Sequence, residues 1–179
     1  MHLRATRNLL ATSVVAIMAM TARADDRMAA SSRVNARTDK ASANEALGRR
    51  YFEQVWNQGR LDVLDELLAP TYVNHTPSVP NPMPGPAGLK PIVRAIRHAF
   101  PDLHYEIKDV IATDTAVVMR VVMTGTQSGE LFGLPASGKR ISVDQINIEH
   151  IENGRIVEHW RVTDELSLMR QLDALHDSH

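Results

Sequence analysis

The 179-residue sequence contains no cysteine. Disulfide bonds are therefore excluded, and so are a cysteine nucleophile and any metal site that needs a thiolate. The sequence also lacks a cluster of lysine and arginine residues, so we expect no binding to nucleic acid. What remains is a chain with 44% hydrophobic residues, which is typical of one globular domain with a sizeable core.

The histidines lack a spacing that would suit a metal ion. Neither an H-E-x-x-H motif nor another close pair on one helix face occurs in the sequence. The sequence therefore predicts no metal site, and nothing in it indicates a cofactor. The last residues, 176–179, are expected to form a frayed tail.

The longest apolar run lies near the N-terminus and is too short for a permanent membrane anchor. The basic segment "MHLRATR" precedes the apolar "NLLATSVVAIMAM", and "TARA" places Ala22 and Ala24 at the small positions of a cleavage site. This order predicts a signal peptide over residues 1–24 and a periplasmic or secreted protein with no membrane attachment after cleavage. The alternative is a buried N-terminal helix. Cleavage would remove three arginines and no acid, changing the net charge from −1 to −4.

The rest of the chain reads as a short leader followed by one domain. Residues 25–40 lack apolar periodicity and are expected to form a flexible leader, and the domain spans 41–175. Asp164 is expected to cap the last helix, and the proline-rich segment 77–88 must be a loop, either a pocket rim or a plain connector. Helices are expected at 42–59, 61–68, 89–100 and 164–173, and strands at 71–76, 103–112, 115–126, 139–151 and 155–163.

Four stretches resemble the SnoaL-like polyketide cyclase (ester cyclase) family of the nuclear-transport-factor-two-like superfamily. They are "YFEQVWNQGRLDVLDELLAPTYVNH", "FPDLHYEIKDV", "GELFGLPASGKRI" and "HIENGRIVEHWRVTD", and they cover roughly residues 45–173. The resemblance implies an α+β fold in which a cone-shaped, curved antiparallel sheet wraps around the N-terminal helices as an α+β barrel. It also implies an apolar pocket inside the cone and a homodimer through the outer face of the sheet.

Polar residues recur at alternate positions of the last two predicted strands, and alternate side chains of a strand share a face. Gln145, Asn147 and Glu149 therefore lie on one face of the first strand, and His159 and Arg161 on one face of the second. His159 is a candidate base or a structural histidine of the barrel. Glu149 is a candidate ligand-binding residue or base, unless it lies at the open rim or in a structural ion pair.

The register between these strands depends on the turn at Asn153–Gly154. A two-residue turn would place Ile146 opposite Arg161. A three-residue loop would instead place Asn147 opposite His159 and Gln145 opposite Arg161. We prefer the three-residue loop because it gathers the polar residues on one face. The outer face would then carry Ile146, Ile148, Ile156 and Trp160, and is expected to pack against a helix or a second copy of the chain.

The resemblance implies a pocket at Asn74, Gln145, Asn147 and Arg161. Asn74, Gln145 and also His159 match the cyclases as they stand, whereas Asn147 replaces a histidine. Arg161 replaces the aspartate that acts as general acid and base in the ring-closing aldol reaction of the cyclases. Tyr72 shares a face with Asn74 and completes a Tyr-x-Asn pair, which is similar to one that limonene epoxide hydrolases use to hold water.

The arginine changes the chemistry that we expect. Arg161 cannot act as a base, because a guanidinium does not lose its proton under ordinary protein conditions. It can bind a carboxylate or an enolate oxygen through its planar fork. The family's aldol mechanism is therefore not expected to carry over through this residue.

Three functions remain open from the sequence, and whether the chain is an enzyme is undecided. The first is binding of a small apolar molecule with a carbonyl or carboxylate end. The second is a cyclase, isomerase or hydrolase with His159 or Glu149 as base and Arg161 as oxyanion stabiliser. The third is a dimeric interaction module. The candidate ligand-binding residues are Tyr72, Asn74, Gln145, Asn147 and Glu149, beside Arg161.

Overall fold

The computed structural model describes the backbone of residues 5–80 and 82–174 and the side chains of residues 25–80 and 82–174. The predicted tail at 176–179 and the side chains of the predicted signal peptide lie outside this part. The chain divides into two compact units, residues 1–39 and 40–179. Residues 25–40, for which the sequence predicts a flexible leader, are part of helix α1 (Ala5–Arg50), and all of their side chains are exposed. Within the described part, no helix is both long and apolar enough to span a membrane.

The second unit begins with helices that bury aromatic side chains. A π-helix, η1 (Tyr51–Asn57), follows α1 directly and buries Tyr51, Phe52, Val55 and Trp56. Its wider turns bring both members of two adjacent pairs, Tyr51–Phe52 and Val55–Trp56, to the buried side. Gly59 has a φ angle of 72° and ends the segment, as predicted.

Three further elements bring the chain to the main sheet. They are α2 (Val63–Leu67), the strand β1 (Leu68–Asn74) and α3 (Pro86–Ala99). α3 begins three residues before its predicted start, because Pro86 occupies its first turn, where a proline costs no hydrogen bond. The close approach of the preceding loop requires Gly88, since a Cβ atom there would lie 1.7 Å from the carbonyl oxygen of Met83.

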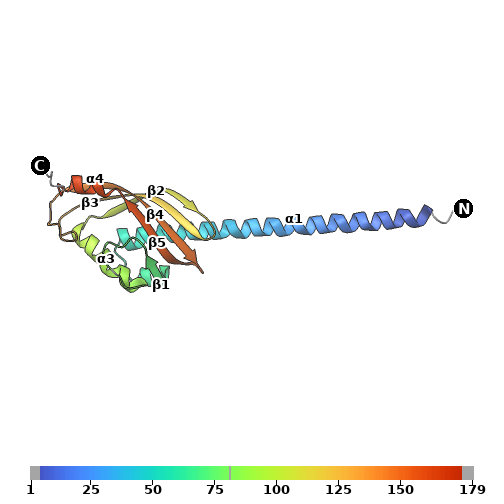
Figure 1. Ribbon diagram of the computed structural model, residues 1–179, viewed down its shortest axis with the longest axis horizontal. Coiled ribbons are helices and arrows are strands. Elements are labelled where there is room, and N and C mark those ends of the chain that lie inside the picture. Colours follow the sequence, from blue (N-terminus) through green and yellow to red (C-terminus); the bar gives the residue numbers. More distant parts are fainter. Residues whose placement is uncertain (1–4, 81, 175–179) are drawn as a thin grey trace. The chain divides into compact units, whose positions relative to one another are not determined.

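The five strands form one curved, open sheet in the order β1-β5-β4-β3-β2. The strands not yet introduced are β2 (His104–Ala112), β3 (Ala116–Thr126), β4 (Arg140–Glu152) and β5 (Arg155–Thr163). Figure 1 shows α3 and the end of α1 on one side of this sheet. β1 runs parallel to β5 and the other neighbours are antiparallel. The α+β class and the curved sheet agree with the sequence, but the sheet is mixed and does not close into a barrel.

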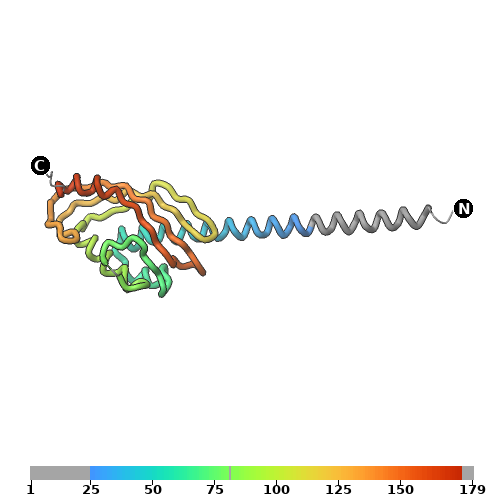
Figure 2. The backbone as a smooth tube through the Cα atoms, in the orientation of Figure 1, coloured from blue at the N-terminus to red at the C-terminus, as the bar shows by residue number. Residues whose placement is uncertain are grey.

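The β4–β5 turn differs from the preferred prediction. It is a two-residue turn in which Asn153 and Gly154 have φ angles of 50° and 73°. Glu152 therefore pairs with Arg155 across it. Asn-Gly is the sequence that this type of turn favours, and the hairpin can be followed in Figure 2 as the orange-to-red part of the tube before the last helix.

A bulge in β5 then sets the register of the site. The pairing shifts by one residue between His150 and Ile151, so Asn147 lies opposite Arg161 and Glu149 opposite His159. The predicted pairs of Asn147 with His159 and of Gln145 with Arg161 are therefore wrong. The bulge still leaves the polar residues of the two strands on one face.

The same bulge moves Ile156 from the predicted outer face into the core. Ile156 lies opposite Ile151, before the shift, and is fully buried. Ile146, Ile148 and Trp160 stay on the outer face, where Ile146 pairs with Val162. The last helix, α4 (Glu165–Gln171), follows β5, and its N-cap residue Asp164 accepts a hydrogen bond from the backbone N–H of Ser167, as predicted.

Candidate functional site

The inner face of β4 and β5 carries a row of buried polar side chains. Residues of β4 alternate strictly between buried and more exposed, and its buried set includes Gln145, Asn147 and Glu149. On β5, His159 is buried and Arg161 is half-buried. A polar row on the buried face is unusual, because each of these groups has lost its water and needs a partner.

Glu149 and His159 supply partners for one another. The Nδ1 atom of His159 lies 2.9 Å from Oε1 of Glu149, and the two residues are 4% and 0% exposed. The second carboxylate oxygen, Oε2, has no hydrogen-bond partner among the described residues. The carboxylate therefore orients the imidazole, leaving Nε2 as the nitrogen that can take part in chemistry.

Two tyrosines lie in the electrostatic field of this pair. Burial raises the pKa of Tyr51 far above its ordinary value, and the negative charge of Glu149 raises it further. Burial also raises the pKa of Tyr72, with further increases from Tyr51 and Glu149. Both phenols therefore keep their protons at any physiological pH and are available as hydrogen-bond donors. The hydroxyl of Tyr72 has no partner among the described residues.

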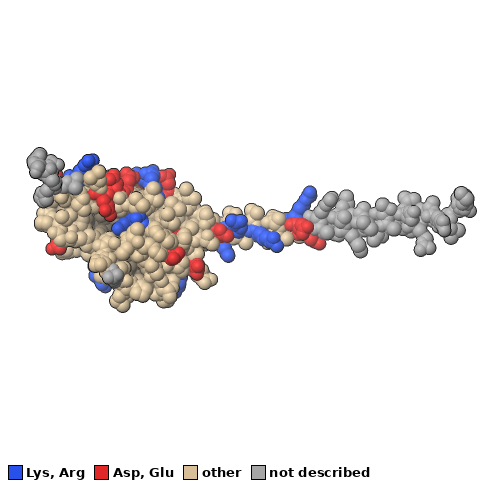
Figure 3. All heavy atoms as spheres, viewed as in Figure 1, with Lys and Arg blue, Asp and Glu red and all other residues tan. Residues whose placement is uncertain are grey.

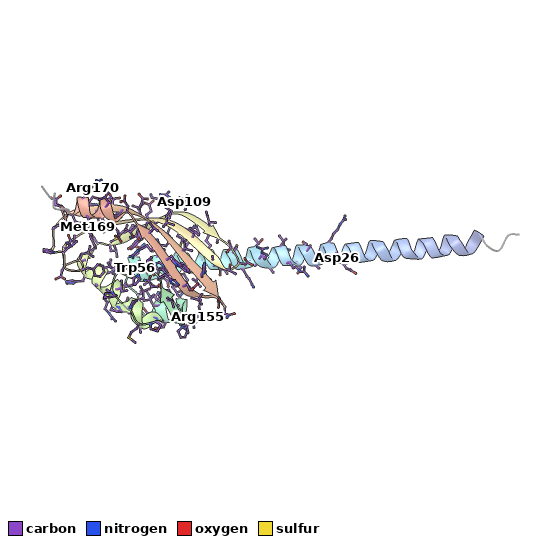
Figure 4. The ribbon with its side chains drawn as sticks, viewed as in Figure 1. Asp26, Trp56, Asp109, Arg155, Met169 and Arg170 are labelled. Atoms are coloured by element: carbon purple, nitrogen blue, oxygen red, sulfur yellow. The ribbon has the colours of Figure 1, made fainter. Side chains whose placement is uncertain are left out.

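A cleft of about 490 Å³ opens in front of Arg161. Its polar lining includes Gln145, Tyr105 and Thr163 beside the arginine, and Glu165 lies at the start of α4. The rest of its wall is mainly apolar and is formed by residues of α3, β3 and α4 and by a short turn at 131–134. Figure 4 labels Met169, one of the α4 residues that line the cleft.

Arg161 faces this cleft without a carboxylate partner. Its guanidinium donates to the hydroxyl of Ser78 at 3.0 Å, and its backbone N–H donates to Thr76 Oγ1 at 2.7 Å. It forms no ion pair with any residue in the described part of the chain. Arginine carries five N–H donors, so most of its capacity is open to a ligand.

Gln145 and Tyr105 have only weak partners in the cleft wall. The amide of Gln145 and the hydroxyl of Tyr105 both point at the sulfur of Met123, at 3.6 and 3.4 Å. Burial raises the pKa of Tyr105 to about 12, against smaller lowering effects of Arg161 and of the nearby side chain of Gln145. A thioether is a weak acceptor, so a ligand oxygen would be a better partner for both groups.

Tyr72 and Asn74 do not line this cleft. They border a separate hollow of about 200 Å³ beneath the proline-rich loop. The side-chain oxygen of Asn74 accepts a hydrogen bond from the backbone N–H of Thr76 at 2.9 Å and so stabilises a turn. The predicted set is thus divided: Gln145 and Arg161 line the large cleft, Asn147, Glu149 and His159 are buried outside its lining, and Tyr72 and Asn74 lie at the second hollow.

Sequence reasoning did not identify Tyr105 and Ser78 as site residues. Tyr105 could have been found, since the alternation of the strand at 103–112 places it on the buried face. Ser78 lies in the proline-rich loop, for which a pocket rim and a plain connector were equally consistent with the sequence. The loop does border the cleft through Pro77 and Ser78, next to Thr76.

The described residues contain no group of three or more histidine, aspartate or glutamate side chains that could hold a metal ion. On the face seen in Figure 3, acidic and basic side chains are interspersed over the second unit rather than separated into patches. His75 lies away from the cleft and stacks on Trp160, with ring centroids 4.3 Å apart. Glu158 bridges His75 and His150 at 3.3 and 3.0 Å.

Comparison with known proteins identifies the family. The chain is 30% identical over 125 residues to the aklanonic acid methyl ester cyclase DnrD of Streptomyces peucetius, covering 69% of this chain and 86% of that protein. It is 28% identical over 120 residues to the nogalonic acid methyl ester cyclase of Streptomyces nogalater, covering 66% of this chain and 89% of that protein.

Solved structures agree. TsrD from Streptomyces laurentii superposes with a TM-score of 0.69 at 32% identity, over 75% of this chain and 97% of that one. IdmH, a putative polyketide cyclase from Streptomyces antibioticus, superposes with a TM-score of 0.63 at 30% identity, over 73% of this chain and 98% of that one. The family model for SnoaL-like polyketide cyclases matches residues 46–172, and the chain therefore belongs to the SnoaL-like polyketide cyclase family.

Proposed function

We propose that this protein binds a small, largely apolar molecule through a carbonyl or carboxylate group that reaches Arg161. The observation that carries the proposal is the half-buried guanidinium, which faces a cleft of about 490 Å³ and has Ser78 as its side-chain partner. A cation that is partly removed from water gains most from a ligand oxygen with negative charge. The apolar wall of the cleft would receive the body of the molecule.

The test is mass spectrometry of small molecules that the protein retains through purification under native conditions. Wild type is compared with Arg161→Ala and with Arg60→Ala, a control that removes an exposed arginine paired with Asp62. We expect wild type and the control to retain a carbonyl- or carboxylate-bearing compound that Arg161→Ala loses. Equal retention by all three proteins would contradict the proposal.

A second candidate is an enzyme in which His159 is the base and Arg161 stabilises the oxyanion. The hydrogen bond of 2.9 Å between His159 and Glu149 favours it, because a base held by a carboxylate is the arrangement that general-base catalysis uses. The proton would pass from the carbon beside the substrate carbonyl to Nε2, while the guanidinium binds the enolate oxygen. Binding remains the first proposal, because neither member of the pair lines the cleft.

The enzyme candidate has a direct test. The retained compound is incubated in D₂O with wild type or with His159→Gln, and the hydrogen beside its carbonyl is followed by NMR. We expect exchange with solvent at least about a hundredfold faster with wild type. If neither protein accelerates exchange, the compound is bound and not turned over.

We propose further that the outer face of the sheet joins two copies of the chain. Ile146 and Val162 are 48% and 72% exposed and face one another across β4 and β5, beside the pair of Ile148 and Trp160. Exposed apolar pairs on a sheet face are characteristic of subunit contacts. Light scattering is expected to give a dimer for wild type and for Leu166→Glu, which changes an exposed apolar residue elsewhere, and a monomer for Val162→Glu. A wild-type monomer would disprove this.

We propose finally that the protein is exported and cleaved after Ala24. The sequence from the basic start to "TARA" supports this. When the full chain is expressed in a bacterium, the mass of the periplasmic protein should correspond to a chain beginning at Asp25. Ala24→Asp should leave the segment uncut, and recovery of the full-length chain from the cytoplasm with wild type would count against export.

A further inference from the structure

A two-residue turn at the cleft holds an aromatic residue in an unfavourable backbone conformation. Leu131 and Leu134 exchange two backbone hydrogen bonds of 2.9 Å. Between them, Phe132 and Gly133 have φ angles of 46° and 90°. A positive φ suits the glycine, but it brings the Cβ atom of a phenylalanine close to its own backbone.

The same chain contains a turn of this kind built with the preferred residues. At the end of β4 the corresponding positions are Asn153 and Gly154, with φ angles of 50° and 73°. Asparagine tolerates the left-handed conformation because its short amide can hydrogen-bond locally. The local preference of the turn therefore does not account for Phe132, so the reason for an aromatic residue must be sought in what its side chain contacts.

Buried contacts fix this turn in place. Gln127 is fully buried, and its amide donates to the carbonyls of Leu134 and Pro135 at 3.3 and 3.1 Å. Its oxygen accepts from the hydroxyl of Ser137 at 2.7 Å. Leu131 anchors the other side of the turn in the core. The position of Phe132 is thus set in advance by a buried polar network rather than by its own packing.

Phe132 itself stays at the surface. Its side chain is 48% exposed, yet it lines the cleft together with Leu131, Leu134 and the α4 residues Leu168 and Met169. An aromatic ring half in water at the edge of a cleft has apolar area left to bury. Arg161 lines the polar end of the same cleft.

We propose that Phe132 is a ligand-contacting residue that packs on a flat ring in the body of the bound molecule. This rests on the proposed function, in which Arg161 binds the carbonyl or carboxylate end. The two residues together select a ring-bearing carbonyl compound or carboxylate over an aliphatic one, because ring faces pack on one another with added attraction. The strained turn is the structural cost of presenting the ring.

The experiment uses two carboxylates of different shape, 2-naphthoate and hexanoate, titrated by calorimetry. Wild type is compared with Phe132→Asn, which places the preferred residue in the turn, and with Phe132→Tyr, which keeps the ring. We expect Phe132→Asn to bind 2-naphthoate about tenfold more weakly and hexanoate within about twofold of wild type. Phe132→Tyr should bind both as wild type does. The melting temperature of Phe132→Asn should equal or exceed that of wild type, because the strain is relieved.

The outcomes separate the two proposals. If neither carboxylate binds wild type, or if Arg161→Ala binds both as tightly, the proposed function fails and the role of Phe132 fails with it. If binding requires Arg161 but 2-naphthoate binds wild type and Phe132→Asn equally, only the role of Phe132 is overturned. Phe132→Leu guards against a folding defect in the asparagine variant, since it keeps an apolar side chain without a ring and should also lose affinity for 2-naphthoate.

Discussion

At the scale of single residues, the site is defined by which polar groups have partners. Glu149 and His159 share a hydrogen bond inside the fold, whereas Arg161 has a serine and open space before it. A buried group with a partner supports stability, and a half-buried cation without a counterion favours a ligand. The two kinds of residue should therefore respond differently to mutation.

The buried pair should behave as a unit in unfolding experiments. Glu149→Leu leaves the Nδ1 of His159 without its acceptor, and His159→Phe leaves a buried carboxylate without a partner. Each change should destabilise the fold by about 3 kcal/mol. The double variant should be more stable than the sum of the two losses predicts by at least about 1 kcal/mol. Urea unfolding of all four proteins measures this coupling, and additive losses would show that the pair is not coupled.

Asp102 should give the fold part of its pH dependence. Its carboxylate accepts from the backbone N–H and the hydroxyl of Thr126 at 2.6 and 2.9 Å. These bonds lower its pKa, with a smaller contribution from Arg140. Because the folded pKa lies below the unfolded one, the stabilisation is complete above about pH 4 and disappears as the pH falls through the lowered value.

The comparison of wild type with Asp102→Asn isolates that contribution. The difference in melting temperature between them should be constant from pH 5 to 7 and should shrink towards zero as the pH falls below about 4 and through the lowered pKa. Glu106 and Glu158 also have lowered pKa values, but they are present in both proteins and cancel. A difference that grows on acidification would contradict the assignment.

At the scale of elements, the β4–β5 hairpin shows what the sequence could and could not predict. The alternation correctly placed Gln145, Asn147 and Glu149 on one buried face. The register could not be read from that pattern, because a bulge can restore the alternation after any turn. Asn153–Gly154 was itself a strong signal for the two-residue turn, and the error came from assuming an unbroken ladder beyond it.

Helix α4 is short, and one of its side chains is hydrogen-bonded to the backbone of the neighbouring strand β4. The side-chain oxygen of Gln171 accepts from the backbone N–H of Ser142 in β4 at 2.7 Å, and its side-chain nitrogen donates to the carbonyl oxygen of Ser142 at 3.0 Å. In this way it extends the ladder of β4 as a strand residue would. Because Leu168 and Met169 line the cleft, this attachment also fixes part of the cleft wall.

Gln171→Ala should loosen α4 while the sheet remains folded. We expect a loss of about 1 kcal/mol in global stability, with faster amide exchange in α4 than in β3 or β4. Arg170→Ala, which changes an exposed neighbour on the same helix, is the matched control and should leave exchange unchanged. Uniform acceleration in both helix and sheet would mean that α4 does not open separately.

At the scale of the whole molecule, the order of the elements was predictable and their closure was not. Each helix and strand from residue 42 onward has a local signal in its apolar spacing, so all of them were anticipated. The parallel pairing of β1 with β5 joins residues far apart in sequence. Such a contact is set by packing over the whole domain. Because β1 is parallel to β5, the sheet is mixed, and it stays open where a closed antiparallel barrel was expected.

The division of the chain predicts where the independent domain begins. The second unit starts at Lys40, and side chains 25–40 are exposed. A chain that begins at Lys40 should therefore melt within about 2 °C of one that begins at Asp25, because exposed residues contribute little to stability. Thermal unfolding followed by circular dichroism measures the difference.

The family match begins at residue 46, inside that domain. A chain that begins there should be less stable than one that begins at Lys40. The amide of Asn44 is buried and donates to the carbonyl oxygen of Thr113 at 2.9 Å, in the turn between β2 and β3. A chain that begins at Ala46 lacks this bond and leaves that carbonyl without it, which should cost about 1 to 2 kcal/mol. Asn44→Ala in the chain from Lys40 should reproduce most of the loss. If the chain from Ala46 is as stable as the chain from Lys40, residues 40–45 contribute nothing to the stability of the domain, and the family boundary is also the physical one.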